Sequence, residues 1–258
     1  MANFLTAECL PRLVELISKP RLSPYMRACN DNLSQAFELY AWNLELGASF
    51  YAPLAILEIV VRNAMHRELT ALFGASWHRN EQFQRVGTKI IEARLSVVSG
   101  RPPQKASTDI LTQPAKIDGK LRAERARKMG PTSPIGTKEA PTTDDIVASL
   151  DFGYWTSLLN RDVENTLYAA GLYKAFPHAP HARKKKPHRA QIAEKLRDLR
   201  IFRNRVMHHE PLFNRKSIRK DLQSIIEVCG WIAPTAEEWV KHLSKVEATL
   251  ETAPIPLR

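Results

Sequence analysis

Cysteine is scarce in this sequence and gives no sign of a covalent framework. Cys9, Cys29 and Cys229 are odd in number, far apart and without a CxxC pair, which argues against disulfides and against a thiolate metal site. We expect the three to be small core residues.

Long apolar runs are missing as well. No stretch of 18 apolar residues occurs, and the first residues, MANFLTAECLPRLVE, include an acid and a proline where a signal peptide needs a basic start and an unbroken apolar segment. The sequence therefore predicts a cytoplasmic protein with no membrane partner.

Several enzyme signatures are also absent. There is no glycine-rich phosphate loop and no serine or cysteine in a nucleophile context. His178, His181 and His188 precede the pair His208–His209, but without cysteine or HExxH spacing. We expect neither a metal nor a cofactor.

Strand patterns are almost absent, whereas apolar residues recur with the helical period of 3.6. Three segments show this period: Leu33, Phe37, Tyr40 and Leu44; Ile218, Leu222, Ile225 and Cys229; and Trp239, Leu243, Val246 and Leu250. The predicted fold class is all-α.

A change of composition divides the chain. Residues 99–143 hold six of the 17 prolines and four of the 10 glycines, around the basic helix-like stretch AKIDGKLRAERARKM. We interpret 99–143 as a partly irregular insertion between an N-terminal helical half, 1–98, and a C-terminal helical half, 144–258. The two halves are expected to share one core.

Positive charge is in excess and is locally concentrated. The chain has 38 Lys and Arg against 27 Asp and Glu, a net charge of +11, which predicts a polyanionic partner. Ten basic residues fall between 183 and 205, against only Glu194 and Asp198: Arg183, Lys184, Lys185, Lys186, Arg189, Lys195, Arg197, Arg200, Arg203 and Arg205. We interpret this basic run as a phosphate-binding segment, and the alternative interpretation is a solvated basic helix.

The same helix ends in the stretch RNRVMHHEP, residues 203–211. An apolar stripe at Ile192, Leu196, Leu199, Phe202 and Val206 anchors it, and Glu210 before Pro211 predicts an end near 208–210. The helix dipole favours a protonated imidazole there and so raises the pKa of a histidine, which suits general acid–base chemistry.

Arg203 and His208 do not share a helix face. Five residues apart, they lie roughly 140° apart around an ideal helix. Either the last turn distorts, or a second subunit completes the site across a twofold axis. Arg205 shares the face of both histidines as a structural neighbour. The competing interpretation is that HHEP only caps the helix.

These residues resemble a known family. Arg203-Asn204, three residues and His208 match the Arg-Asn-x-x-x-His signature of the HEPN superfamily of helical RNA-cleaving domains, and LRIFRNRVMHHEPLF resembles its Abi-like (abortive infection) branch. AFELYAWNLELGASFYAPLAILEIVVRNAMHREL (36–69) and DDIVASLDFGYWTSLL (144–159) are similar to other segments of that branch. The resemblance implies a HEPN-like helical bundle, here with an N-terminal helical extension.

The resemblance also implies metal-independent RNA cleavage by attack of the ribose 2′-OH, in phage defence or as a toxin. His208 would be the general acid or base, Arg203 would stabilise the phosphorane and Asn204 would orient one of them. Supporting residues would be Arg205, His209 and Glu210; RNA-binding residues would be Arg183, Lys184, Lys185, Lys186, Arg189, Arg197 and Arg200. Implied partners are RNA, a second copy, and a protein or noncoding-RNA antitoxin.

A polar stripe crosses the apolar stretch 55–65. Glu58, Arg62 and His66 lie on one helical face with Asn63 beside them. Glu58, Arg62 and Asn63 are interpreted either as a structural network or as supporting residues of an RNA cleft. The alternatives for the whole protein are a non-catalytic HEPN module that binds RNA or protein, and a helical regulator of duplex DNA.

Overall fold

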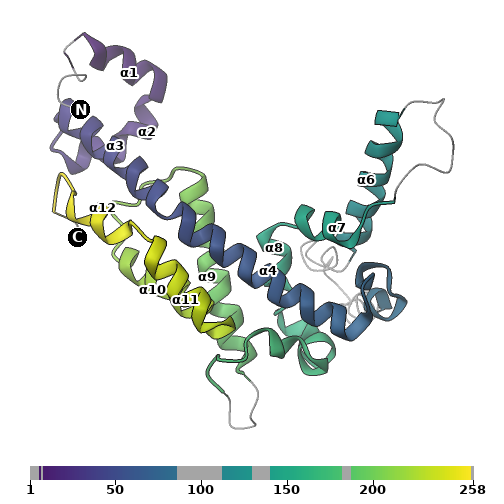
Figure 1. The fold of residues 1–258 in the computed structure, drawn as a ribbon. Helices are drawn as coiled ribbons and strands as arrows, with labels where there is room; N and C mark the ends of the chain where they lie inside the picture. Colours follow the sequence, from purple (N-terminus) through teal and green to yellow (C-terminus); the bar gives the residue numbers. More distant parts are fainter. Residues whose placement is uncertain (1–5, 7, 86–111, 130–139, 182–186, 257–258) are drawn as a thin grey trace, which may run out of the picture. The chain divides into compact units, whose positions relative to one another are not determined.

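The computed structural model describes residues 6, 8–85, 112–129, 140–181 and 187–256, and in these ranges the chain is helical (Figure 1). Its α-helices are α1 (Cys9–Ile17), α2 (Lys19–Ala28), α3 (Leu33–Ser49), α4 (Tyr51–Phe73), α6 (Gln113–Met129), α7 (Thr143–Ser149), α8 (Phe152–Ser157), α9 (Arg189–Met207), α10 (Ile218–Ile232), α11 (Pro234–Leu243) and α12 (Val246–Glu251). Short helical turns are η1 (Trp77–Arg79), η3 (Arg161–Val163), η4 (Glu164–Tyr168) and η5 (Leu172–Ala175). Within the described ranges the only β pairing is an isolated bridge between His181 and Pro187. The all-α prediction is confirmed.

The chain forms two compact units, each discontinuous in sequence. Unit 1 comprises Met1–Leu57, Ile201–Glu227 and Thr235–Arg258. Unit 2 comprises Glu58–Arg200 and Val228–Pro234. Residues from both sides of the predicted insertion therefore enter each unit. The described parts of the insertion, 112–129 and 140–143, fall in unit 2, and the rest of 99–143 lies outside the described residues.

Unit 1 is built on contacts of α3 with α2 and α12. The buried ring of Tyr25 packs against Tyr40 and Phe213, each with a centroid separation of 5.0 Å. At the other side of α3, Trp42 donates from Nε1 to the Thr249 carbonyl at 3.0 Å. These contacts tie the N-terminal helices to the C-terminal end of the chain.

Unit 2 has an aromatic core around Trp77, which is fully buried. Its ring contacts Phe83 and Trp155, and its Nε1 donates to His66 Nδ1 at 2.9 Å. Accepting this bond requires a neutral imidazole nitrogen, and burial lowers the pKa of His66, in agreement with that state. His66 is thus part of the core of unit 2.

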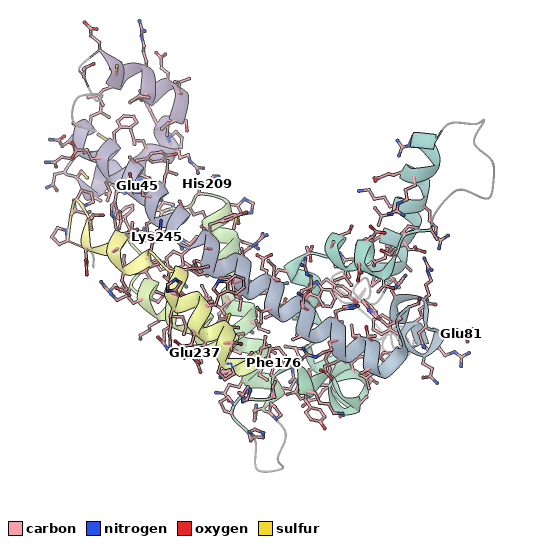
Figure 2. All side chains as sticks on the ribbon, in the orientation of Figure 1. Glu45, Glu81, Phe176, His209, Glu237 and Lys245 are labelled. Atoms are coloured by element: carbon pink, nitrogen blue, oxygen red, sulfur yellow. The ribbon has the colours of Figure 1, made fainter. Side chains whose placement is uncertain are left out.

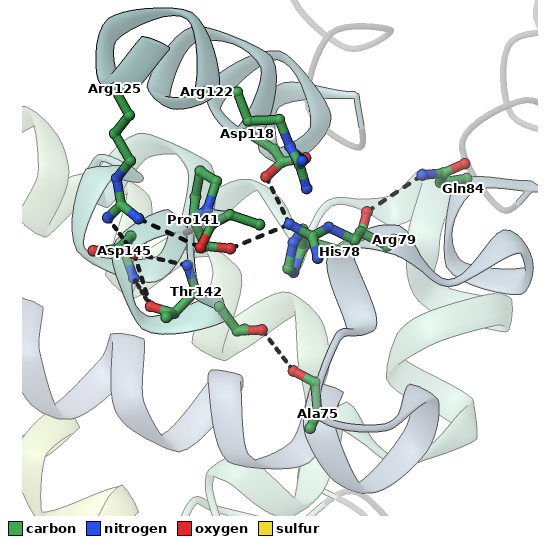
Figure 3. Close-up of polar contacts among 12 residues, drawn as sticks. Ala75, His78, Arg79, Gln84, Asp118, Arg122, Arg125, Pro141, Thr142 and Asp145 are labelled. Atoms are coloured by element: carbon green, nitrogen blue, oxygen red, sulfur yellow. Dashed lines mark hydrogen bonds and ion pairs between the residues drawn. The ribbon is translucent and has the colours of Figure 1, made fainter. Parts of the chain in front are cut away.

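Helix α6, from the predicted insertion, is fastened to its neighbours by ion pairs (Figure 3). The Asp118 carboxylate lies 2.9 Å from Arg79 Nη2 and 3.0 Å from Arg122 Nε. Burial acts to raise the pKa of Asp118, but the hydrogen bonds from these two arginines outweigh it and leave the pKa below its ordinary value. The helix-like reading of this basic stretch is confirmed.

Helix α7 begins with a capping box. Thr142 Oγ1 accepts from the Asp145 N–H, and the Asp145 carboxylate accepts from the Thr142 N–H at 2.7 Å. Arg125 of α6 adds an ion pair to Asp145 at 2.8 Å (Figure 3). Hydrogen bonds from Thr142 lower the pKa of Asp145, and the largest contribution comes from the Thr142 backbone N–H.

The predicted apolar stripes differ in outcome. The stripe of α10 is buried at all four positions, Ile218, Leu222, Ile225 and Cys229. In the last stripe Trp239 and Leu243 are exposed, and the single predicted helix is two, α11 and α12. The break falls at Ser244 and Lys245, where the Ser244 Oγ accepts from the Val246 N–H at 3.4 Å.

Two other details of the core were predicted wrongly. Leu44 is exposed, because α3 buries the face that carries Leu39, Trp42 and Leu46. Cys9 is only half-buried on α1, whereas Cys29 and Cys229 are buried as predicted.

One segment, Leu33–Phe73, is long and apolar enough to cross a membrane by length and composition. It consists of α3 and α4, which are separate helices that meet at Phe50. Some of its apolar residues, among them Leu39, Leu54 and Val61, belong to the buried core. The segment does not indicate a membrane protein.

Candidate active site at the end of helix α9

Helix α9 ends where the sequence predicted, in a defined capping structure. Its stripe at Ile192, Leu196, Leu199, Phe202 and Val206 is buried. His209 has a positive φ of 54°, and its N–H donates to the Val206 carbonyl at 3.0 Å. The Glu210 N–H donates to the Arg205 carbonyl at 3.0 Å. These two bonds form a Schellman motif with His209 in the left-handed position that glycine usually takes. Figure 2 shows His209 at this end of α9.

A buried asparagine holds the chain after the helix. Asn43 of α3, only 2% exposed, accepts at Oδ1 from the Leu212 N–H at 2.6 Å and from the Phe213 N–H at 3.2 Å. Its Nδ2 donates to the Glu210 carbonyl at 3.4 Å. Asn43 therefore fixes the path of the segment that follows His209, and sequence reasoning missed it.

Two arginines bind the carbonyls at the end of α9. Arg21 of α2 donates from Nη2 to the carbonyls of His208, at 3.2 Å, and His209, at 2.9 Å. Arg205 donates to the Pro211 carbonyl at 3.0 and 2.8 Å and lies 3.7 Å from the Glu210 carboxylate. Arg205 thus holds the chain after the helix, which agrees with its interpretation as a structural neighbour of the histidines. Both guanidinium groups offset the negative end of the helix dipole.

The three motif side chains are accessible. Asn204 and His208 are exposed and Arg203 is half-buried, with its Nη1 3.4 Å from Asn204 Oδ1. The last turn is undistorted, because the His208 N–H donates to the Asn204 carbonyl at 2.9 Å. Of the two ways to bring Arg203 and His208 together, distortion of the helix is therefore contradicted.

A small pocket of about 230 Å³ lies beside the capped helix end. His209 and Glu210 line it, together with residues of α3 and the start of α4. Its lining includes two exposed hydrophobic side chains, Leu44 and Tyr51. The motif thus stands next to an accessible, largely apolar hollow of unit 1.

The polar stripe of α4 belongs to unit 2. Arg62 is half-buried and its Nε lies 3.4 Å from the Oδ1 of the exposed Asn63. Glu58 is half-buried. The neighbouring His66 has its structural bond to Trp77. The role of Glu58, Arg62 and Asn63 in an RNA cleft stays a prediction.

The predicted RNA-binding residues fall into two groups. Arg183, Lys184, Lys185 and Lys186 lie outside the described residues. Arg189, Arg197 and Arg200 of α9 line a pocket of about 710 Å³ in unit 2, which also includes Arg161. Sequence reasoning missed Arg161, which lies far from the basic run and carries no local signal.

Among the described residues, no group of three or more His, Cys, Asp or Glu is placed to hold a metal ion. His178, His181 and His188 are all exposed. Comparisons with protein-family models, curated proteins and solved structures found no match to this chain.

Proposed function

We propose that this protein is a metal-independent endoribonuclease of the HEPN type, of the Abi-like group, that acts in the cytoplasm in phage defence or as a toxin. The observation that carries the proposal is the accessible set Arg203, Asn204 and His208 on a helix end that Arg21, Arg205 and Asn43 hold through hydrogen bonds. A site on a rigid support keeps reacting groups in a productive geometry.

In the proposed reaction the ribose 2′-oxygen attacks the adjacent phosphorus. The O2′–P bond forms, the P–O5′ bond breaks, and the products are a 2′,3′-cyclic phosphate and a 5′-hydroxyl. His208 takes the 2′-OH proton or gives a proton to the leaving O5′, and solvent water makes the other of these two transfers. Arg203 stabilises the phosphorane charge through its planar guanidinium, and Asn204 orients the side chain of either Arg203 or His208. DNA lacks the nucleophile and is not cut.

A second copy of the chain is part of the proposal. Arg203 and His208 leave an undistorted helix roughly 140° apart, so one chain does not bring both to the same phosphate. A twofold axis near the helix ends supplies His208 from one subunit and Arg203 from the other. The exposed Leu44 and Tyr51 beside the motif support such an interface.

A non-catalytic RNA- or protein-binding module is the second candidate. The observation that favours it is the separation of Arg203 and His208 on one helix, which leaves a lone chain without an assembled site.

If the protein is a nuclease, a protein or noncoding-RNA antitoxin is a fitting partner, because an unrestrained RNA-cleaving enzyme damages its own cell.

The experiment compares wild-type protein, His208→Ala and the control His242→Ala, an exposed histidine of α11 in the same unit. Each is incubated in EDTA with labelled single-stranded RNA and matched DNA, and the product ends are analysed. Wild type and His242→Ala are expected to cut RNA alone and leave a cyclic phosphate. His208→Ala should be slower by about 10²–10⁴-fold. Tight RNA binding without cleavage by any variant would establish the binding module instead.

A further inference from the structure

Unit 2 contains a polar pocket whose lining includes no residue of the motif. Its volume of about 710 Å³ is in the range of pockets that hold small-molecule ligands, about 300–1,000 Å³. One wall is the part of α9 from Arg189 to Arg200, which includes Arg197, and the other is α8 with the following turn to Arg161. Four arginines thus line one pocket.

The lining holds two acids, Asp151 and Glu194, against four arginines, which leaves an excess of two positive charges. The Asp151 carboxylate accepts from the Tyr154 N–H at 2.7 Å and caps α8. Glu194 is mostly exposed and its oxygen is 3.8 Å from Arg197, a weak surface pair. The pocket keeps an excess of positive charge.

The arginines differ in how far they are already engaged. Arg189 donates to the Leu159 carbonyl at 2.6 Å and pairs with Glu164 at 2.9 Å. Within the described part of the chain, the guanidinium groups of Arg161 and Arg200 make neither a hydrogen bond nor an ion pair. Arg200 is half-buried, so its charge has lost part of its hydration without gaining a partner. Binding an anion would supply that partner.

Backbone packing positions Arg200. A Cβ added at Gly153 would lie 3.4 Å from Arg200 Nη1 and 3.1 Å from Asp151 Oδ1. The guanidinium therefore lies close against the backbone of α8, over a residue without a side chain. Neutral polar groups, among them the exposed Asn160 amide, complete the lining.

We propose that this pocket binds a phosphate-bearing nucleotide unit, with Arg161 and Arg200 on the phosphate oxygens and Asn160 on the sugar or base. Arginine forks match phosphate oxygens in pairs, which makes phosphate a better ligand than a single carboxylate for several arginines. The nucleotide is either one unit of an RNA strand or a free mononucleotide. The inference goes beyond the proposed function, because the pocket contains no residue of the cleavage motif.

The test measures binding without cleavage. The probes are a 12-nucleotide 2′-O-methyl RNA, which lacks the free 2′-OH, and AMP. The pocket variant is Arg161→Ala with Arg200→Ala. Its charge-matched control is Arg67→Ala with Arg85→Ala, two exposed arginines of unit 2 whose side chains are 65% and 71% accessible. Circular dichroism and thermal melting check the folding of both.

The pocket variant is expected to bind at least one probe about tenfold more weakly than wild type, while the control stays within about twofold. Arg200→Lys, which keeps the charge but loses the fork, should be intermediate. Weakened AMP binding identifies a mononucleotide site, and weakened binding of the oligomer alone identifies a strand site. Equal affinities for the pocket and control variants would overturn the proposal. Since neither probe is cut, a failed cleavage assay with His208 leaves this result intact.

Discussion

At the scale of single residues, His209 is the most strained position of the candidate site. Its φ of 54° lies in the left-handed region, where a Cβ crowds the backbone. Replacing His209 with glycine should remove about 1 kcal/mol of strain, whereas alanine keeps the strain and also loses the imidazole. Thermal unfolding should therefore rank His209→Gly above His209→Ala in stability.

Activity measured on the same two variants separates the backbone of His209 from its side chain. If its role is only to complete the Schellman motif, His209→Gly keeps RNA cleavage. Cleavage lost equally in both variants would assign a direct role to the imidazole, and equal melting temperatures would refute the strain argument.

The residues that hold the motif show why sequence reasoning was incomplete. Arg203, Asn204 and His208 were found because they are close together in sequence. Arg21 and Asn43 contact the same helix end across separations of 187 and 169 residues. Nothing local marks either of them, since an arginine on a surface helix and an asparagine in a mid-helix position are both ordinary.

At the scale of elements, a continuous helix was predicted well and a broken one was not. The stripe of α9 is regular to its last turn, and Pro211 limits where the helix can end. Residues 239–250 fit the same period, yet the chain leaves the helix at Ser244 and Lys245, which divides them between α11 and α12. A break of two residues that preserves the apolar period is not detected by a periodicity argument.

The attachment of α6 should depend on pH. The folded pKa of Asp118 is lowered, so its contribution to stability is present above the ordinary carboxyl pKa of about 3.9 and is lost as the pH falls through the folded value. We expect Asp118→Asn to destabilise unit 2 by about 1 kcal/mol at pH 7, and by less below pH 4.

Thermal melting of wild type and Asp118→Asn at pH 7 and pH 3.5 measures this difference. Asp198→Asn is the control, because its carboxylate is exposed on α9 and lies 3.5 Å from an exposed Arg197. A destabilisation of Asp118→Asn that is the same at both pH values would contradict the assignment.

At the scale of the whole molecule, the net charge of +11 favours any polyanion, but local placement should decide affinity. Two phosphate contacts from Arg161 and Arg200 correspond to a slope of about −1.4 in log Kobs against log salt for a single strand. The double variant of these residues should therefore have a slope shallower than wild type by about 1.4.

Titration of RNA binding between 50 and 300 mM salt tests this. The variant lacking Arg67 and Arg85 also loses two positive charges, but away from the pocket, and should keep the wild-type slope. Identical slopes for the two variants would show that overall charge alone governs binding. Single-stranded DNA of equal length should show a similar slope, because phosphate contacts do not distinguish the two sugars.

Because unit 1 draws its segments from both ends of the chain, the ribosome delivers its parts far apart in time. Asn43 and Leu212, which meet beside the motif, are 169 residues apart. At about 5–20 residues per second, roughly 10–30 s of translation separate them. The N-terminal helices cannot complete unit 1 until its later segments have been synthesised. A nascent chain released before residue 208 has no capped helix to carry the motif. Translation products that end before residue 208 thus lack the proposed nuclease site altogether.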